Sequence, residues 1–120
     1  MRARLLAITL VLVAVAASAA CSPASPPDEN PSVRGTITSI SRSGDSGSML
    51  VESAGPPVFD VDRAQVRVDG DTSLLREAED GYEPIAFSEF AEGDAVDIWF
   101  EGPVAESYPV QAYARAIVLR

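Results

Sequence analysis

The sequence predicts an all-β fold, a small barrel of five strands with one short helical turn, preceded by a signal peptide and a disordered linker. Three observations predict it. From Val33 onward, short runs rich in β-branched residues are separated by Gly, Pro and Asp, which is typical of small all-β domains. Residues 87–94 have the composition of a single helical turn. Residues 33–120 are enough for one hydrophobic core and little else.

Residues 1–20 have the three-part layout of a secretory signal. Met1–Arg4 is basic, and the thirteen residues from Leu5 to Ala17 carry no charge. A membrane-spanning helix needs about 20 apolar residues. This stretch is therefore too short for a permanent span, and it predicts export.

Cys21, the only cysteine, directly follows this signal. With Ala19 and Ala20 it resembles a bacterial lipobox, in which the Cys becomes the acylated first residue of the mature chain. We expect Cys21 to carry acyl chains such as palmitate, which predicts a lipoprotein anchored to the outer face of the bacterial cell membrane. Ser18 stands where a larger aliphatic residue is usual. The alternative is cleavage before Ala20 and secretion without an anchor.

Residues 21–32 form the predicted linker. The segment after Cys21 reads SPASPPDENPS, with four prolines and no large apolar side chain. Because it has nothing to bury, we expect an extended and disordered tether. At about 3.1 Å per residue it reaches at most roughly 35 Å.

Alternation of apolar and polar residues predicts the strands of the barrel domain, residues 33–120. Gly35 in the first run indicates a bend or bulge, and the turn formers of residues 43–47 indicate a hairpin between the first two runs. Residues 73–83 have no clear period, which favours a loop or a short irregular extension. The predicted strands are residues 33–40, 48–52, 64–68, 95–100 and 111–119.

Residues 87–94 predict the helical turn before the fourth strand. Ser88 is placed to cap its start, and Gly93 to close it, since Gly tolerates a left-handed backbone. Five strands with a helical turn at this place fit an OB-like, partly open barrel of the oligonucleotide/oligosaccharide-binding type. A fold of this kind does not by itself fix the ligand.

Two parts of the chain resemble a known family. Residues 93–112, which contain the Gly-Pro, Glu-Ser-Tyr-Pro and Gln-Ala elements, are similar to the closing signature of the YobA-like domain of unknown function. Residues 33–38 and 47–52 resemble the start of that domain, and residues 73–85 match it least. The resemblance covers roughly residues 33–120. It implies a small bacterial secreted or lipid-anchored protein whose barrel-like domain has no established activity.

Composition excludes several kinds of chemistry. Eighteen Asp and Glu oppose nine Arg, so the net charge is -9 and the pI is near 4.3; a nucleic acid is therefore not an expected partner. With no His and one Cys, the chain cannot form a Ser-His-Asp triad or a His-bearing zinc site. A domain this small offers little room for a walled cleft. We predict a protein that is not an enzyme, with no catalytic residue, metal or cofactor.

Four residues are candidates for partner binding. Trp99 lies on the strand face opposite Val96, Ile98 and Phe100, so it is a candidate stacking platform, and the alternative is that it caps a second small core. Glu106 and Tyr108 lie in a Pro-rigidified loop, which is either a recognition loop or a brace over the barrel end. Tyr113 lies on the last strand and is expected to share the surface of Trp99.

The function that these observations favour is a non-enzymatic, lipid-anchored cell-envelope domain that binds a protein or an envelope polymer. The alternative is a secreted carboxylate-based enzyme or a calcium-binding module. Calcium would use the pairs Asp60 and Asp62 or Asp69 and Asp71, although Asp-Gly-Asp is also an ordinary turn composition. The sequence names neither the partner nor the oligomeric state.

Overall fold

The computed structural model describes residues 24–53 and 61–120; the predicted signal, Cys21 and Asp60 lie outside these ranges. The all-β prediction is confirmed, since the regular structure consists of strands and one short 3₁₀ helix, η2 (Phe87–Glu89). The strands are β1 (Val33–Ser43), β2 (Ser46–Glu52), β3 (Arg63–Val68), β4 (Ser73–Ala78), β5 (Gly81–Pro84), β6 (Ala95–Ala105) and β7 (Val110–Leu119).

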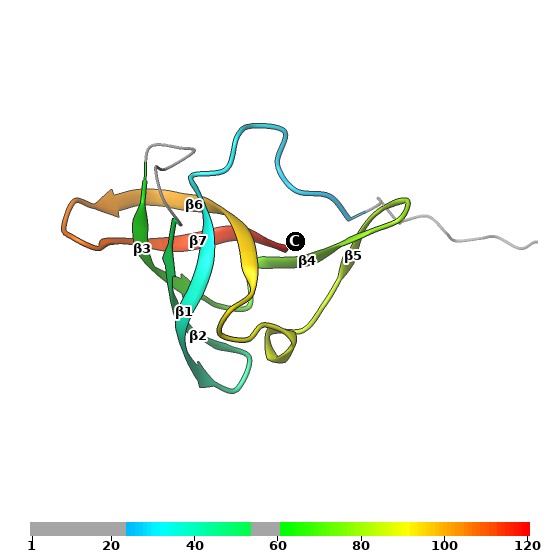
Figure 1. Cartoon of the computed structure of the whole chain (residues 1–120), viewed down its shortest axis with the longest axis horizontal. Coiled ribbons are helices and arrows are strands. Elements are labelled where there is room, and N and C mark those ends of the chain that lie inside the picture. The colour runs from blue at the N-terminus through cyan, green and yellow to red at the C-terminus, as the bar shows by residue number, and fades with distance from the viewer. Residues whose placement is uncertain (1–23, 54–60) are drawn as a thin grey trace, which may run out of the picture.

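Five of these strands form the barrel, and they are the five that alternation predicts. Antiparallel pairing joins β1 to β2, β2 to β3, β6 to β7 and β1 to β6. A parallel pairing of β3 with β7 completes the ring, with Ala64 opposite Val110 and Arg67 opposite Tyr113. The barrel is therefore closed where a partly open one was expected (Figure 1).

β1 pairs with two neighbouring strands at different parts of its length. Residues 36–43 pair with β2, whereas residues 33–36 pair with β6. The irregularity in the pairing with β2 falls just after Ile37, not at Gly35 as expected. Gly35 is needed for space instead, since a β-carbon there would overlap the carbonyl oxygen of Glu52.

Residues 73–83 are not the loop that was expected. They form β4 and most of β5, which pair with each other in antiparallel fashion. β4 also runs parallel to the end of β7, with Ser73 opposite Ala116, so this hairpin extends the sheet beyond the barrel (Figure 1). The prediction was wrong because β5 is exposed along its length and β4 buries only Leu75. Neither strand has the apolar alternation of a half-buried strand.

The barrel interior is filled by inward side chains of its five strands and by two phenylalanines next to η2. Phe87 and Phe90 are both buried in this core, with ring centroids 6.4 Å apart. Because they enter from outside the five strands, they cover one end of the barrel. The buried members of the core are Val33, Ile37, Met49, Val51, Ala64, Val66, Val68, Phe87, Phe90, Val96, Ile98, Ala114 and Ile117.

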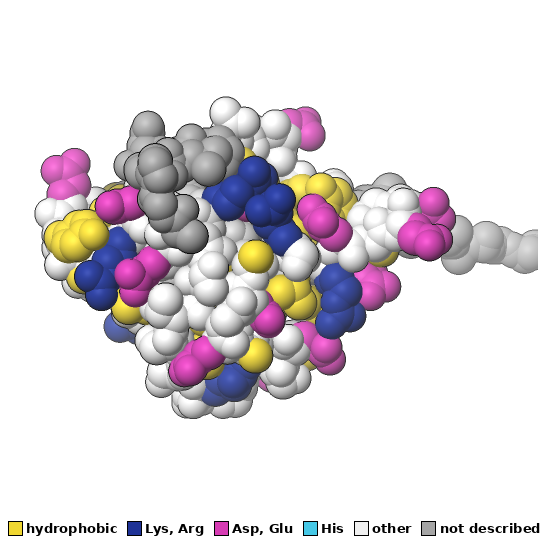
Figure 2. Space-filling model, viewed as in Figure 1, with side chains coloured by type: hydrophobic (Ala, Val, Ile, Leu, Met, Phe, Trp, Pro, Cys, Tyr) yellow, Lys and Arg dark blue, Asp and Glu magenta, His cyan; other side chains and the backbone are white. Residues whose placement is uncertain are grey.

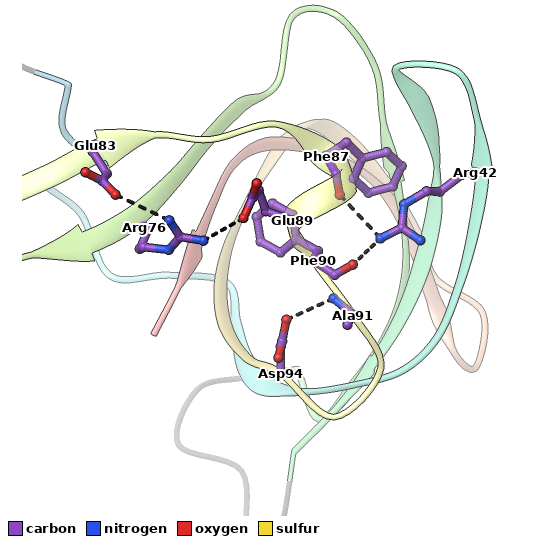
Figure 3. Close-up of polar contacts among 8 residues, drawn as sticks. All are labelled: Arg42, Arg76, Glu83, Phe87, Glu89, Phe90, Ala91 and Asp94. Atoms are coloured by element: carbon purple, nitrogen blue, oxygen red, sulfur yellow. Dashed lines mark hydrogen bonds and ion pairs between the residues drawn. The ribbon is translucent and has the colours of Figure 1, made fainter.

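Side chains from β1 and β4 fix the segment around η2 (Figure 3). The Arg42 guanidinium donates hydrogen bonds to the carbonyl oxygens of Phe87 and Phe90, and lies 5.3 Å from the centroid of the Phe87 ring. Arg76 of β4 donates to a carboxylate oxygen of Glu89 at 2.8 Å. Two arginines thus hold the turn that presents the phenylalanines to the core.

The helical turn is shorter than predicted and is capped differently. η2 has three residues, and its N-cap is Ala86, not Ser88, without a side-chain hydrogen bond. Gly93 has the expected positive φ of 97°. It lies in a turn in which the Asp94 carboxylate accepts a hydrogen bond from the Ala91 N–H at 2.9 Å (Figure 3).

Residues 24–32 have no strand, but they pack against β6. The Trp99 indole N–H donates to the carbonyl oxygen of Glu29 at 2.8 Å. The Ser32 hydroxyl accepts from the Phe100 N–H at 3.1 Å, and Ala24 contacts the cluster around Trp99. The expectation of a disordered tether is therefore wrong for residues 24–32. The reason is that the Trp99 ring lies on the outward face of β6, and residues 24–32 shield this apolar ring from water.

Trp99 belongs to a second, smaller core on the outside of the barrel. Its side chain is only 5% exposed. The buried members of this core are Leu75, Trp99, Ala116 and Val118. β4, β6, β7 and the N-terminal segment therefore share one layer of apolar contacts.

Across residues 24–53 and 61–120, no helix has the length and hydropathy of a membrane span.

Candidate binding groove

A groove of about 800 Å³ crosses the outer face of β3 and β7. Strict alternation in β3 turns Ala64, Val66 and Val68 into the core, so Gln65 and Arg67 point outward. The parallel register places Gln65 opposite Gln111 and Arg67 opposite Tyr113. The floor is made of two amides, a guanidinium and a phenol. This groove is larger than the size of the domain led us to expect.

The walls of the groove come from two hairpins. On one side lie the end of β1 and the start of β2, which contribute serine hydroxyls. On the other side lie Pro103 and Ala105 of β6, where the pairing with β7 is irregular between Glu101 and Ala105. The lining residues are Ser43, Ser46, Gly47, Ser48, Gln65, Arg67, Val68, Asp69, Pro103, Ala105, Gln111, Ala112 and Tyr113.

Two arginine–tyrosine pairs lie along β3. The Arg67 guanidinium lies 6.0 Å from the centroid of the Tyr113 ring, and that of Arg63 lies 5.7 Å from the centroid of the Tyr108 ring. A guanidinium within about 6 Å of an aromatic face is held there by the charge distribution of the ring. The pairing restricts both side chains and leaves their outer surfaces accessible.

The loop of residues 106–109 joins the last two groove-lining segments of the chain. Tyr108 is 68% exposed and Tyr113 is 51% exposed, and both lie on the β3 side of the barrel through their arginine partners. Glu106 is exposed in the same loop, and the Ser107 hydroxyl donates to the carbonyl oxygen of Pro109 at 2.8 Å. Three of the four predicted partner-binding residues are thus exposed on or beside one surface.

Trp99 does not share this surface. Its ring is covered by residues 24–32 and packed against Leu75, Ala116 and Val118. The expectation of an exposed platform at Trp99 is therefore wrong, and the alternative of a second small core is confirmed. Alternation placed Trp99 correctly on the outward face, but could not show what covers that face.

Exposed apolar side chains are concentrated on the groove side. In the part of the chain that the structure describes, the large exposed hydrophobic residues are Tyr82, Tyr108 and Tyr113, and two of these three flank β3. On the face shown in Figure 2, acidic and basic side chains are interspersed.

A smaller hollow of about 510 Å³ lies next to the groove and shares Tyr113 with it. It is lined by the carboxylates of Asp69, Asp71 and Glu101. The Asp69 carboxylate accepts a hydrogen bond from the Asp71 N–H at 2.9 Å, which is the bonding of an ordinary Asx turn. Among the described residues, no three Asp, Glu, Cys or His side chains are placed together to hold a metal ion.

Sequence reasoning missed the groove-floor residues Gln65, Arg67 and Gln111. Alternation does show that Gln65 and Arg67 face away from the core, and that was the available signal. Their meeting with Gln111 and Tyr113 depends on the parallel pairing of β3 with β7, which joins segments far apart in the chain.

Comparison with models of known protein families, with curated proteins and with solved structures finds no match to this chain.

Proposed function

We propose that this chain is a non-catalytic binding module of the bacterial cell envelope, which holds an envelope polymer in the groove of β3 and β7. The observation that carries the proposal is the groove itself. It is concave, and its polar lining consists mainly of uncharged serine hydroxyl and glutamine amide groups, beside an exposed tyrosine. A concave surface with a few convergent polar groups is the usual form of a ligand site.

The strand order supports the same proposal. The closed ring β1-β2-β3-β7-β6 is the arrangement of an OB-type barrel, and barrels of this type use the outer face of their second and third strands, with the adjoining loops, to bind oligosaccharides and oligonucleotides. The groove overlaps that face at β3 and at the start of β2, and extends from there onto β7. The net charge of -9 argues against the nucleic acid.

The test is retention of the full-length protein on insoluble envelope polymer that has been stripped of protein. We expect saturable retention of the wild type, and a loss of about tenfold for Tyr113→Ala, because the exposed ring contributes a contact surface worth about 1.4 kcal/mol. Tyr82→Ala is the matched control, since Tyr82 is a partly exposed tyrosine on β5, outside the groove. Equal retention of wild type and a folded Tyr113→Ala variant would reject this surface. Retention that requires the envelope proteins would assign the groove to a protein partner.

Membrane anchoring through Cys21 belongs to the same proposal. Because residues 24–32 pack on the barrel, only two residues lie between Cys21 and the packed Ala24, so the three steps from one to the other span at most about 11 Å. An acylated Cys21 would hold the barrel close to the membrane surface, not at the end of a 35 Å tether. Intact-mass analysis of the membrane fraction tests this, since it distinguishes an acylated Cys21 from an unmodified thiol.

The resemblance of residues 33–120 to the YobA-like domain stays a prediction. It supports the proposal in one respect, because it implies a small exported bacterial protein with a barrel-like domain.

A further inference from the structure

We propose that the groove recognises a carboxylate-bearing sugar unit of an otherwise uncharged glycan, with the carboxylate bound by Arg67. This inference rests on the proposed function and specifies the ligand of that site. Three observations support it: Arg67 has no ion pair, uncharged hydroxyl and amide groups surround it, and carboxylates lie in the groove and in the adjoining hollow.

Arg67 differs from the other arginines of the described chain because its guanidinium has neither a carboxylate oxygen within 4.0 Å nor a hydrogen bond. Five of them lie within 4.0 Å of a carboxylate oxygen, namely Arg34, Arg63, Arg76, Arg115 and Arg120. Arg42 donates to two backbone carbonyl oxygens. Arg67 contacts only the Tyr113 ring. In a chain with eighteen acidic residues, its guanidinium donors remain available to a ligand.

The position of Arg67 suits a bidentate contact with a carboxylate. The cation–π contact with Tyr113, at 6.0 Å from the ring centroid, restricts the guanidinium within the groove, so less conformational entropy is lost when a ligand binds. A guanidinium presents two parallel N–H donors to a carboxylate, and this pairing gives geometric specificity as well as energy. Arg67 therefore supplies a selective anchor for one anionic group.

The groove around Arg67 suits hydroxyl groups. Gln65 and Gln111 each provide an amide donor and an acceptor, and Ser46 and Ser48 provide hydroxyls. The half-exposed Tyr113 ring adds a flat apolar surface for the C–H face of a sugar. Uncharged donors and acceptors beside an aromatic ring match a polyhydroxylated ligand.

The acidic neighbours argue against a ligand with many anionic groups. Asp69 lines the groove, and Asp71 and Glu101 line the adjoining hollow. Arg115 also lines this hollow, but its guanidinium lies 3.6 Å from a carboxylate oxygen of Glu29. A second anionic group of the ligand near these carboxylates would be repelled over a distance of about 8 Å at physiological salt. One carboxylate at Arg67, flanked by neutral sugar units, fits this distribution of charge.

The test compares defined soluble sugars by titration calorimetry with the full-length protein. The probes are hyaluronan oligosaccharides, in which a carboxylate occurs on every second sugar, neutral chitin oligosaccharides of equal length, and fully carboxylated oligogalacturonate. We expect hyaluronan fragments to bind ten- to hundredfold more tightly than chitin fragments, the range given by a charged hydrogen-bonded pair. Oligogalacturonate is expected to bind more weakly than hyaluronan fragments.

Arg67→Gln is expected to remove the preference for the carboxylated sugar, and Arg67→Lys to restore it only in part, because Lys keeps the charge but not the paired donors. Arg76→Gln is the matched control, since it changes the net charge equally and lies on β4. Equal binding of hyaluronan and chitin fragments, or an Arg67→Gln variant that folds and keeps the preference, would overturn the inference. So would competition by inorganic phosphate at concentrations where acetate does not compete, because it would assign the site to a phosphate.

The inference and the proposed function fail in different ways. A wild-type protein that is retained on envelope polymer but shows no preference for a carboxylated sugar overturns only the inference. A wild-type protein that is not retained on the polymer overturns the proposed function.

Discussion

Asp97 joins the outer sides of β1 and β6. Among the described residues, Asp97 is the one charged residue that is buried. Arg34 donates two hydrogen bonds to its carboxylate, at 2.6 and 2.8 Å. Arg120 lies 3.9 Å from the same carboxylate. The hydrogen bond with Asp97 raises the pKa of the Arg34 guanidinium above its ordinary value. A raised pKa means that the stabilisation is complete below the ordinary pKa of arginine, as long as Asp97 is ionised, and is lost as the pH rises through the pKa of Arg34 in the folded state.

At this residue scale we predict that Arg34→Gln lowers the free energy of unfolding by about 1–2 kcal/mol, because it removes the bidentate partner of a buried carboxylate. The figure is at the low end of the range since the Arg34 side chain is 35% exposed. The loss should be constant between about pH 6 and 9, where Arg34 stays charged. Urea denaturation measures it.

Arg76→Gln is the control for this prediction. Arg76 is also bonded to two carboxylates, those of Glu83 and Glu89, but all three side chains are exposed and screened by solvent. We expect a smaller loss than for Arg34→Gln. Equal losses would show that burial of Asp97 does not decide the strength of its ion pair.

At the scale of elements, alternation identified the five strands that form the barrel but did not identify β4 and β5, which lie outside it. The run at residues 64–68 buries every second residue, and the run at residues 95–100 directs Val96 and Ile98 into the barrel core. Such strands can be recognised from sequence alone. β4 and β5 lie outside the barrel and bury one side chain between them, so the sequence contains no period for them. The same limit applies to residues 24–32, whose contacts use the Glu29 carbonyl oxygen, the Ser32 N–H and small side chains, and none of these has an apolar period.

The N-terminal segment provides the second prediction, that deletion of residues 22–31 exposes Trp99. The deletion removes the carbonyl that accepts the indole N–H and the contact made by Ala24. Because Trp99 is the only tryptophan, the emission of the protein should shift to longer wavelength, and the melting temperature should fall. Trp99→Phe, which keeps a buried ring, serves as the stability control.

An unchanged emission maximum after this deletion would contradict the packing of residues 24–32 on β6. A red shift with unchanged melting temperature would show that the segment covers Trp99 without stabilising the barrel.

At the scale of the whole molecule, the groove forms only because the pairing of β3 with β7 closes the barrel. Gln65 and Arg67 become one surface with Gln111 and Tyr113 only when β3 pairs with β7, and the pair joins strands that are separated by β4, β5, η2 and β6. Tyr108, Tyr113 and Glu106 could be proposed from sequence because they lie in one loop and the strand that follows it. The remaining groove residues could not, because strand register is not visible in composition or period.

The most direct test of the central claim, that the β3–β7 groove is the binding surface, is a map of backbone amide chemical shifts. The full-length protein in detergent micelles would be titrated with soluble glycan fragments released from the envelope. We predict saturable shifts at residues 43–48, 65–69 and 103–113, and none in the hairpin of β4 and β5. Shifts centred on that hairpin or on residues 24–32, with residues 65–69 unchanged, would contradict the account.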